Sequence, residues 1–266
     1  MAHKYDISGE NNKIVLFDDN GHEYPLKKNI PGLNIRVSGN NNTVRIHKKT
    51  IFENSEIVIN NDMAEIEIKE SSLLRILVGM GYGHGQKLHI GRGTRIGGAY
   101  FTLPENGAIF IGDDCLFSDG ILLMAADGHM LFNKDTHEII NMPTPIVIGN
   151  HCWLGHACQI TKGASLADNS VLGLGAILTR RITTPHVAVA GVPARIVREN
   201  IDWSGMQILT FLGNQTGQPQ TETVIPKWPH VKYAFYRFMY HISNGKMRSK
   251  YKHKKSKIKS VLKLKK

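Results

Sequence analysis

The chain has 266 residues, of which 41% are hydrophobic and 26 are glycine. This apolar content is typical of a globular protein and excludes a wholly disordered chain, while no run of about 18 apolar residues is present that could span a bilayer. Three cysteines are too few for a disulfide scaffold, and the opening segment MAHKYDISGENN contains no apolar secretion signal. We therefore expect a protein of the reducing cytoplasm.

The net charge of +11 is concentrated at one end of the chain. Residues 223–266 contain fourteen Lys or Arg and no Asp or Glu, which leaves a formal charge of −3 for residues 1–222. Strongly basic segments bind polyanions such as anionic lipid headgroups, acidic polysaccharides or nucleic acids. The sequence therefore predicts a slightly acidic body and a basic tail with a polyanionic partner.

Residues 1–89 repeat one pattern three times. An aliphatic residue is followed by a polar turn and by a second aliphatic residue seven places on. The pairs are Ile7 and Ile14, Val37 and Val44, and Ile59 and Ile66. Short alternating strands surround these turns. We interpret this region as irregular coils of the same kind as the repeats that follow it; the alternative is a separate small β-domain.

Residues 90–200 contain a period of six, most regular from residue 148 onward. An aliphatic residue begins each unit, and a small residue recurs four places later. The aliphatic positions include Ile148, Leu154, Ile160, Leu166, Leu172 and Leu178, and the small ones include Cys152, Cys158, Ala164, Ser170 and Ala176. Neither the 3.6-residue period of a helix nor the two-residue period of a strand explains this spacing. A prism with three flat faces does, because each unit then supplies one strand and one corner.

In such a prism the aliphatic and small residues of every unit point toward the axis. Cys115, Cys152 and Cys158 all fall on the small inward position. We expect these cysteines to pack as small hydrophobic side chains and not to act as nucleophiles.

Three stretches interrupt the period. Residues 79–87 and 102–108 are short excursions, whereas residues 129–145 form a long one, HMLFNKDTHEIINMPTP. Long loops that leave a rigid scaffold tend to carry function. We therefore expect the functional site to include the loop that begins at His129.

The end of the period divides the chain into residues 1–200 and 201–266. Residues 213–223 have the composition of a linker, residues 228–242 combine aromatic and basic side chains, and residues 246–266 place apolar residues at helical spacing among lysines. We expect a partly helical tail whose last part binds an anionic membrane surface. The alternatives are an acidic polysaccharide and a solvated tail; nucleic acid is not expected, because no readout fold accompanies the basic residues.

Four motifs in the repeat region resemble those of a known family. They are Ile148-Gly-Asn-His-Cys-Trp-Leu-Gly-His-Ala, Ile160-Thr-Lys-Gly, Gly173-Leu-Gly-Ala-Ile-Leu-Thr179-Arg180 and Ala190-Gly-Val-Pro-Ala-Arg-Ile-Val-Arg198. They resemble the hexapeptide-repeat acetyltransferases, which include galactoside and maltose acetyltransferases, and above all the capsule polysaccharide O-acetyltransferases of the polysialate type. The resemblance implies an all-β fold, a left-handed parallel β-helix with protruding loops. It also implies a homotrimer with active sites in the clefts between adjacent subunits.

The resemblance implies acetyl transfer from acetyl-CoA to a hydroxyl of a bacterial capsular or cell-surface polysaccharide, in a ternary complex. The attacking hydroxyl needs a base, and imidazole titrates near neutral pH. The family's catalytic His corresponds to His129, and the family's Trp follows it by 24 residues, here at Trp153. We expect Trp153 to face outward and to line the thioester site. The protein would then be cytoplasmic or peripheral on the inner face of the plasma membrane, with its tail on the membrane or on capsule machinery.

Further residues are implied on the donor and acceptor sides of the site. His156 would line the acyl-CoA groove, and cationic and hydroxyl side chains would contact the CoA phosphates. The phosphate candidates are Lys162, Thr179, Arg180, Arg181, Arg195 and Arg198, and the acceptor candidates are His84, His89 and His137.

Three other functions remain open from the sequence. An amino sugar or nucleotide sugar could accept the acetyl group on nitrogen, and a non-catalytic trimer could bind polyanions. The γ-class carbonic anhydrases use the same coil and bind zinc through histidines. His151 and His156 have the required spacing of five residues, but the third position falls on inward Cys115. We therefore expect no metal.

Overall fold

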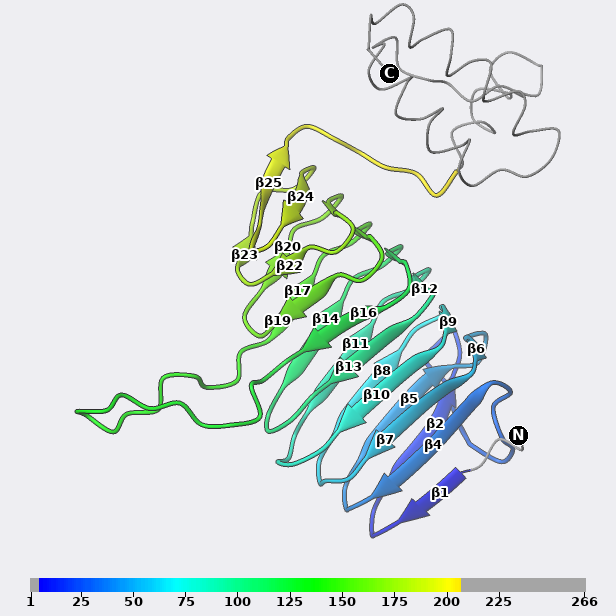
Figure 1. Ribbon diagram of the computed structural model, residues 1–266. Coiled ribbons are helices and arrows are strands. Elements are labelled where there is room, and N and C mark those ends of the chain that lie inside the picture. Colours follow the sequence, from blue (N-terminus) through cyan, green and yellow to red (C-terminus); the bar gives the residue numbers. More distant parts are fainter. Residues whose placement is uncertain (1–4, 207–266) are drawn as a thin grey trace, which may run out of the picture. The chain divides into compact units, whose positions relative to one another are not determined.

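The structure is a computed structural model that describes residues 5–206. Twenty-five strands form three sheets, here called sheets A, B and C, and the chain winds through them in that order, turn after turn (Figure 1). Neighbouring strands within the described residues are parallel, apart from the hairpins β2–β3 and β24–β25 at the ends of sheets B and C. The fold is an all-β, left-handed parallel β-helix, which confirms the predicted fold class.

The strand bounds follow the six-residue frame in the later coils. Sheet A contains β1 (Tyr5–Ser8), β4 (Leu33–Ser38), β7 (Ser55–Ile59), β10 (Ile76–Met80), β13 (Ala99–Thr102), β16 (Ile121–Met124), β19 (Gln159–Thr161) and β22 (Ile177–Leu178). Sheet B contains β2 (Lys13–Phe17), β3 (Glu23–Pro25), β5 (Thr43–His47), β8 (Glu65–Ile68), β11 (Lys87–Ile90), β14 (Ala108–Ile111), β17 (Ile146–Ile148), β20 (Ser165–Leu166) and β23 (Arg181–Ile182). Sheet C contains β6 (Ile51–Glu53), β9 (Ser72–Leu74), β12 (Arg95–Ile96), β15 (Leu116–Phe117), β18 (Trp153–Leu154), β21 (Val171–Leu172), β24 (Ala188–Gly191) and β25 (Ala194–Arg198).

The region before residue 90 is part of the same β-helix. Its strands β1 to β11 add to the three sheets without a break, and a separate small β-domain is wrong. The early strands are longer than the later ones: β4 has six residues, whereas β20 has two. The longer strands explain why the six-residue frame is irregular in this part of the sequence.

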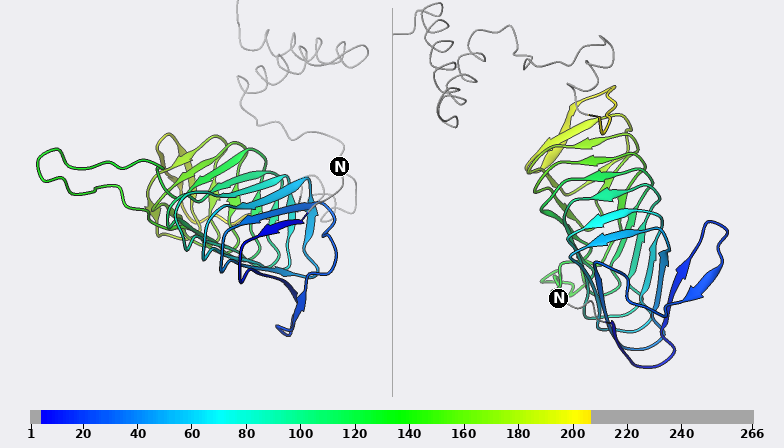
Figure 2. Two further views of the ribbon diagram at one scale, coloured as in Figure 1. Left: turned by 90° about the horizontal axis from the view of Figure 1, so that it is seen from below. Right: turned by 90° about the vertical axis from the view of Figure 1, so that its right-hand side faces the viewer.

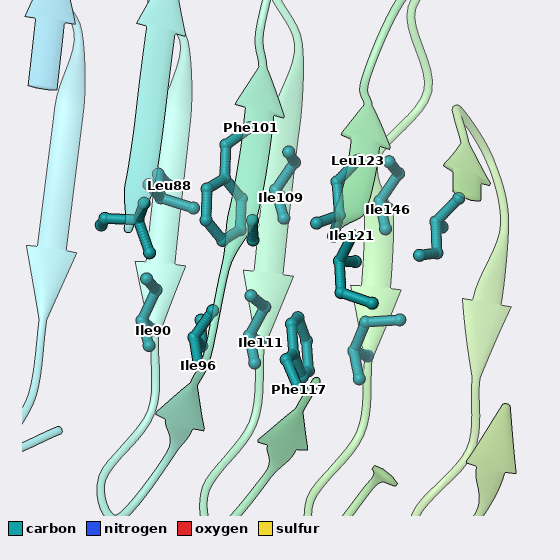
Figure 3. Close-up of a cluster of buried hydrophobic side chains, with 14 of the residues drawn as sticks. Leu88, Ile90, Ile96, Phe101, Ile109, Ile111, Phe117, Ile121, Leu123 and Ile146 are labelled. Atoms are coloured by element: carbon teal, nitrogen blue, oxygen red, sulfur yellow. The ribbon is translucent and has the colours of Figure 1, made fainter. Parts of the chain in front are cut away.

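The core is a column of inward side chains along the axis of the prism. Aliphatic residues from successive coils stack on one another together with Phe101 and Phe117 (Figure 3). Cys115, Cys152 and Cys158 are completely buried, as the repeat predicted. Burial raises the pKa of the Cys158 thiol, which keeps it protonated and unreactive.

Side chains at the corner between sheets B and C tie one coil to the next. The backbone N–H of Arg92 donates to Asp113 Oδ1 at 2.7 Å, that of Asp113 to Asn150 Oδ1 at 2.8 Å, and that of Asn150 to Asp168 Oδ1 at 2.7 Å. A corner leaves backbone N–H groups without sheet partners, and these side-chain oxygens satisfy them. The ladder fixes the register between coils along this edge.

All three interruptions of the repeat lie at one edge of the prism, the A–B corner. Residues 81–86 connect β10 to β11, residues 103–107 connect β13 to β14, and residues 125–145 connect β16 to β17. The first two connections stay close to the coil, and the third projects far from it as a long loop (Figures 1 and 2). The insertions therefore leave the stacking of the three sheets unchanged.

After β25 a short segment, residues 201–205, turns back along the β-helix; we call it the strap. The predicted linker, the aromatic block and the basic helical segment lie outside the described residues. Among residues 5–206, no helix is long and apolar enough to cross a membrane.

Candidate functional site

The long loop at the A–B corner leaves the coil through a rigid base. Gly128 has a φ of +76°, a left-handed conformation that glycine adopts without strain. The Asn141 amide donates to Asp127 Oδ2 and to the His129 carbonyl, both at 2.8 Å. Lys162 Nζ lies 2.7 Å from Asp127 Oδ2 and also donates to the Asn141 carbonyl. These bonds hold the two ends of the loop together.

Charge at the base of the loop is balanced locally. The Lys162 ammonium, with help from the Asn141 amide, holds the pKa of the Asp127 carboxyl below its ordinary value. Lys162 itself is only 18% exposed and is engaged with the loop. The structure thus places Lys162 where it can fasten the loop, and its contact with a CoA phosphate stays a prediction.

His129 is the first residue beyond this base. It is exposed, and its carbonyl is fixed by Asn141. The loop beyond His129 projects from the coil and carries six exposed apolar side chains. They are Met130, Leu131, Phe132, Ile139, Ile140 and Met142. An apolar projection of this kind calls for another surface to cover it.

Trp153 lies on the outer face of sheet C, as predicted. It begins β18 in register with Leu116 below and Val171 above, and 41% of its surface is exposed. A second indole, that of Trp203 from the strap, lies beside it with the ring centroids 6.1 Å apart. Trp153 therefore offers a partly exposed aromatic ring on the outer face of sheet C for contact with a ligand or another subunit.

The topology separates His129 from Trp153 within one chain. His129 follows sheet A at the A–B corner, whereas Trp153 belongs to sheet C, and in a three-sided prism the A–B corner is opposite face C. The loop moreover projects away from the coil (Figure 2). A single chain therefore carries these two predicted site residues on opposite sides of the prism.

The predicted phosphate ligands divide in the same way. Thr179 and Arg180 follow β22 and are exposed at the A–B corner, in line with Lys162. Arg195 and Arg198 are exposed on β25 in sheet C, the sheet that carries Trp153. Within residues 5–206 no carboxylate is paired with Arg180 or Arg198, so these guanidinium groups are available to an anionic ligand.

The remaining predicted histidines are spread over all three sides. His156 is exposed at the corner between sheets C and A, while His84 is exposed at the A–B corner. His89 lies on β11 in sheet B, 3.6 Å from Glu67. His137 is on the long loop, where its ring stacks on Phe132. Only His84 and His137 share the A–B side with His129.

The structure does not bring the carbonic anhydrase residues together. Cys115 is buried in the core, whereas His156 is exposed at another corner. His151 is held at the B–C corner by Asp114, with Nδ1 2.7 Å from Oδ2. Within the described residues, the histidine and carboxylate atoms close enough to share a cation belong to Asp19, His47 and Glu70.

Two features of the site are not readable from the sequence. The fastening of the loop by Asp127, Asn141 and Lys162 joins residues with no periodic relation. The contact of Trp203 with the region of Trp153 joins residues about fifty positions apart. In the sequence this second contact is marked only by Trp203 itself, which follows the end of β25 by five residues.

The chain is similar to known O-acetyltransferases, although no family model matches it. The galactoside O-acetyltransferase of Escherichia coli K12 is 31% identical over 146 residues, which cover 51% of this chain and 70% of that enzyme. The polysialic acid O-acetyltransferase of Neisseria meningitidis is 32% identical over 169 residues, which cover 64% of this chain and 78% of that enzyme. The crystal structure of the polysialic acid O-acetyltransferase OatWY superposes with a TM-score of 0.56 at 29% identity, covering 80% of this chain and 98% of OatWY.

Proposed function

The chain belongs to the hexapeptide-repeat O-acetyltransferases, and we propose that it transfers an acetyl group from acetyl-CoA to a hydroxyl of a bacterial capsular or cell-surface polysaccharide. The observation that supports this most directly is the pair of exposed side chains His129 and Trp153. They stand at the two positions that the family resemblance assigns to catalysis, 24 residues apart.

The proposed reaction is a direct transfer. His129 removes the proton of the acceptor hydroxyl while the hydroxyl oxygen attacks the thioester carbonyl carbon. A carbon–oxygen bond forms, the carbon–sulfur bond breaks, and the proton passes from the imidazole to the departing CoA sulfur. Backbone N–H groups near Trp153 stabilise the negative charge on the carbonyl oxygen. No acyl-enzyme is needed, in keeping with the three buried cysteines.

A complete site needs more than one subunit. The A–B corner carries His129, Thr179 and Arg180, and the opposite face carries Trp153 and two arginines. We propose a homotrimer in which the long loop of one subunit lies against sheet C of the next. The exposed apolar residues of the loop support this arrangement, because a neighbouring subunit would bury them.

The donor side has the chemistry that acetyl-CoA requires. Arg195 and Arg198 present guanidinium groups suited to phosphate oxygens. Trp153, on β18 of the same sheet and separated from β25 by β24 and β21, supplies an apolar surface for the pantetheine arm, with an indole N–H that can donate to the thioester. His156 stays a predicted contact at the next corner.

The proposal is tested by incubating the purified chain with acetyl-CoA and a panel of purified capsular polysaccharides while free thiol is measured. We expect thiol release that depends on one acidic polysaccharide and a product whose acetyl group is removed by mild alkali, since an O-acetyl ester is labile to base. An alkali-resistant amide would identify an N-acetyltransferase. Absence of thiol release with every hydroxyl and amine acceptor would contradict the transferase proposal.

The basic tail is proposed to attach the enzyme to an anionic surface, with a peripheral location on the inner face of the plasma membrane. We expect deletion of residues 246–266 to abolish sedimentation with vesicles that contain anionic lipid, because each lysine near such a surface contributes about 1 kcal/mol. Turnover of short soluble acceptors should stay unchanged. Vesicles of neutral lipid, and binding at high salt, serve as controls. Retained association of the truncated protein with anionic vesicles would refute this role.

A further inference from the structure

The strap runs down the B–C corner of the β-helix. At its start, the Ile201 N–H donates to the His186 carbonyl at 2.9 Å, and His186 Nδ1 lies 3.2 Å from the Ile201 carbonyl. At its end, Gly205 lies against the Arg95 side chain. The strap therefore extends from the coil of β24 to that of β12, passing the level of β18 and Trp153.

The centre of the strap is held by a clasp between His151 and Trp203. The two rings stack with centroids 4.3 Å apart and planes 15° apart. The indole Nε1–H of Trp203 donates to the His151 carbonyl at 2.7 Å. Stacking and hydrogen bonding act on the same pair, so Trp203 has one defined place on the surface of the coil.

The clasp requires a particular protonation state of His151. Its Nδ1 lies 2.7 Å from Asp114 Oδ2, and its Nε2 lies 3.1 Å from the Trp203 carbonyl oxygen. Both partners only accept hydrogen bonds. A neutral imidazole carries one N–H and can satisfy one of them, whereas the imidazolium carries two and satisfies both. The geometry therefore fits the charged form.

The charges around His151 favour the same form. Asp202 of the strap places a carboxylate oxygen 3.6 Å from Nε2, in addition to Asp114 from the coil below. The other acids of this corner, Asp113 and Asp168, are aimed at backbone N–H groups. The cation on the strap side, Arg95, lies at Gly205. Partial burial opposes the charge, but the bonds to Asp114 and Trp203 outweigh it and raise the pKa of His151 above its ordinary 6.5.

Trp203 also touches the residue that the proposed function places at the acyl donor. Its ring centroid lies 6.1 Å from that of Trp153, with the planes tilted by 42°. This is the usual separation of interacting aromatic side chains. Trp153 is 41% exposed on a flat sheet even with Trp203 in place, so the contact with Trp203 limits the orientations open to its indole.

We propose that Trp203 is a positioning residue for Trp153, and that the His151 imidazolium holds Trp203 in place, so that affinity for acetyl-CoA depends on the protonation of His151. The inference rests on the proposed assignment of Trp153 to the acyl-donor site. The direction of this pH dependence follows from the raised pKa of His151. The clasp is complete at pH values below the pKa of folded His151, and it is lost as the pH rises through that pKa.

The kinetic test compares Trp203→Ala, Trp203→Phe and His151→Asn. Asn tolerates the left-handed backbone that His151 adopts, with φ of +50°. We expect Trp203→Ala to raise KM for acetyl-CoA about fivefold with kcat nearly unchanged, and Trp203→Phe to keep most of the affinity. In the wild type KM should rise with pH, whereas in His151→Asn it should be high and independent of pH. The control His22→Asn, at a distant exposed histidine, should retain the wild-type profile.

Two results would overturn the inference: an unchanged KM in Trp203→Ala across the pH range, or a wild-type pH profile in His151→Asn. A second readout does not depend on activity. The imidazole resonances of His151 in NMR spectra should titrate above pH 6.5, together with a change in tryptophan fluorescence that Trp203→Phe removes. A titration at or below 6.5 contradicts the clasp, whereas a normal clasp in a protein without transferase activity would refute the proposed function alone.

Discussion

Replacement of His129 by alanine is expected to lower kcat for acetyl transfer by about 10²- to 10⁴-fold, the usual contribution of a general base. The KM for acetyl-CoA should change little, because His129 is proposed to act on the acceptor hydroxyl and is not among the residues proposed to bind CoA. The rates are measured as thiol release under saturating acceptor. The fold should be unaffected, since the His129 side chain is exposed.

Lys134→Ala provides the matched control for this experiment. Lys134 is exposed on the same loop and is not assigned to the site, so its loss should leave kcat within about twofold of wild type, as for an ordinary surface substitution. Full activity in His129→Ala would contradict the proposed mechanism. Equal losses in both variants would indicate that the loop acts as a whole and that His129 is not the base.

The proposed division of the site between subunits gives the experiment a second arm. His129→Ala and Trp153→Ala chains that are co-expressed should form mixed trimers. A site that takes His129 from one chain and Trp153 from the other is then intact, and random assembly restores about a quarter of the sites. Inactive mixtures of well-formed trimers would contradict a site shared across the subunit boundary.

The largest expected effect on stability is that of Phe117→Ala. Phe117 is 1% exposed and packs among the inward side chains of neighbouring coils (Figure 3). Its truncation removes apolar contact and leaves a cavity that the stacked strands cannot close, because their spacing is fixed by hydrogen bonds. We expect a loss of about 3–5 kcal/mol in the free energy of unfolding, measured by chemical denaturation.

Phe110→Ala is the control for this substitution. It is the same chemical change on β14, the strand that precedes β15 in the chain, but Phe110 faces outward and is 37% exposed. Its loss should cost less than about 1 kcal/mol. If the two variants were equally destabilised, the inward and outward alternation on which the prism depends would be wrong.

The sequence predicts the fold of this protein well because the fold is periodic. The recurrence from Ile148 to Leu178 specifies one strand and one corner per unit, and it correctly places Cys152 and Cys158 inside and Trp153 outside. The early coils are harder to recognise because their strands are longer than those of the later coils: β4 alone has six residues, the length of a whole repeat unit.

The candidate site is predicted only in part, because its geometry depends on contacts that break the period. His129 and Trp153 could be named, but their separation onto opposite sides follows from which sheet each one belongs to. The clasp between His151 and Trp203 joins residues 52 positions apart. Such a contact depends on where the chain goes after the last coil, and hydrophobic spacing does not record that path.

The placement of the three interruptions of the six-residue repeat at the A–B corner has a consequence for how such enzymes diversify. Lengthening a connection there alters neither the stacking of the coils nor the opposite face that carries Trp153. If the loop contacts the acceptor as proposed, acceptor preference can therefore change without any change in how acetyl-CoA is bound. Transplanting the segment 125–145 between homologous enzymes should move sugar selectivity with it while the shared acetyl source stays the same.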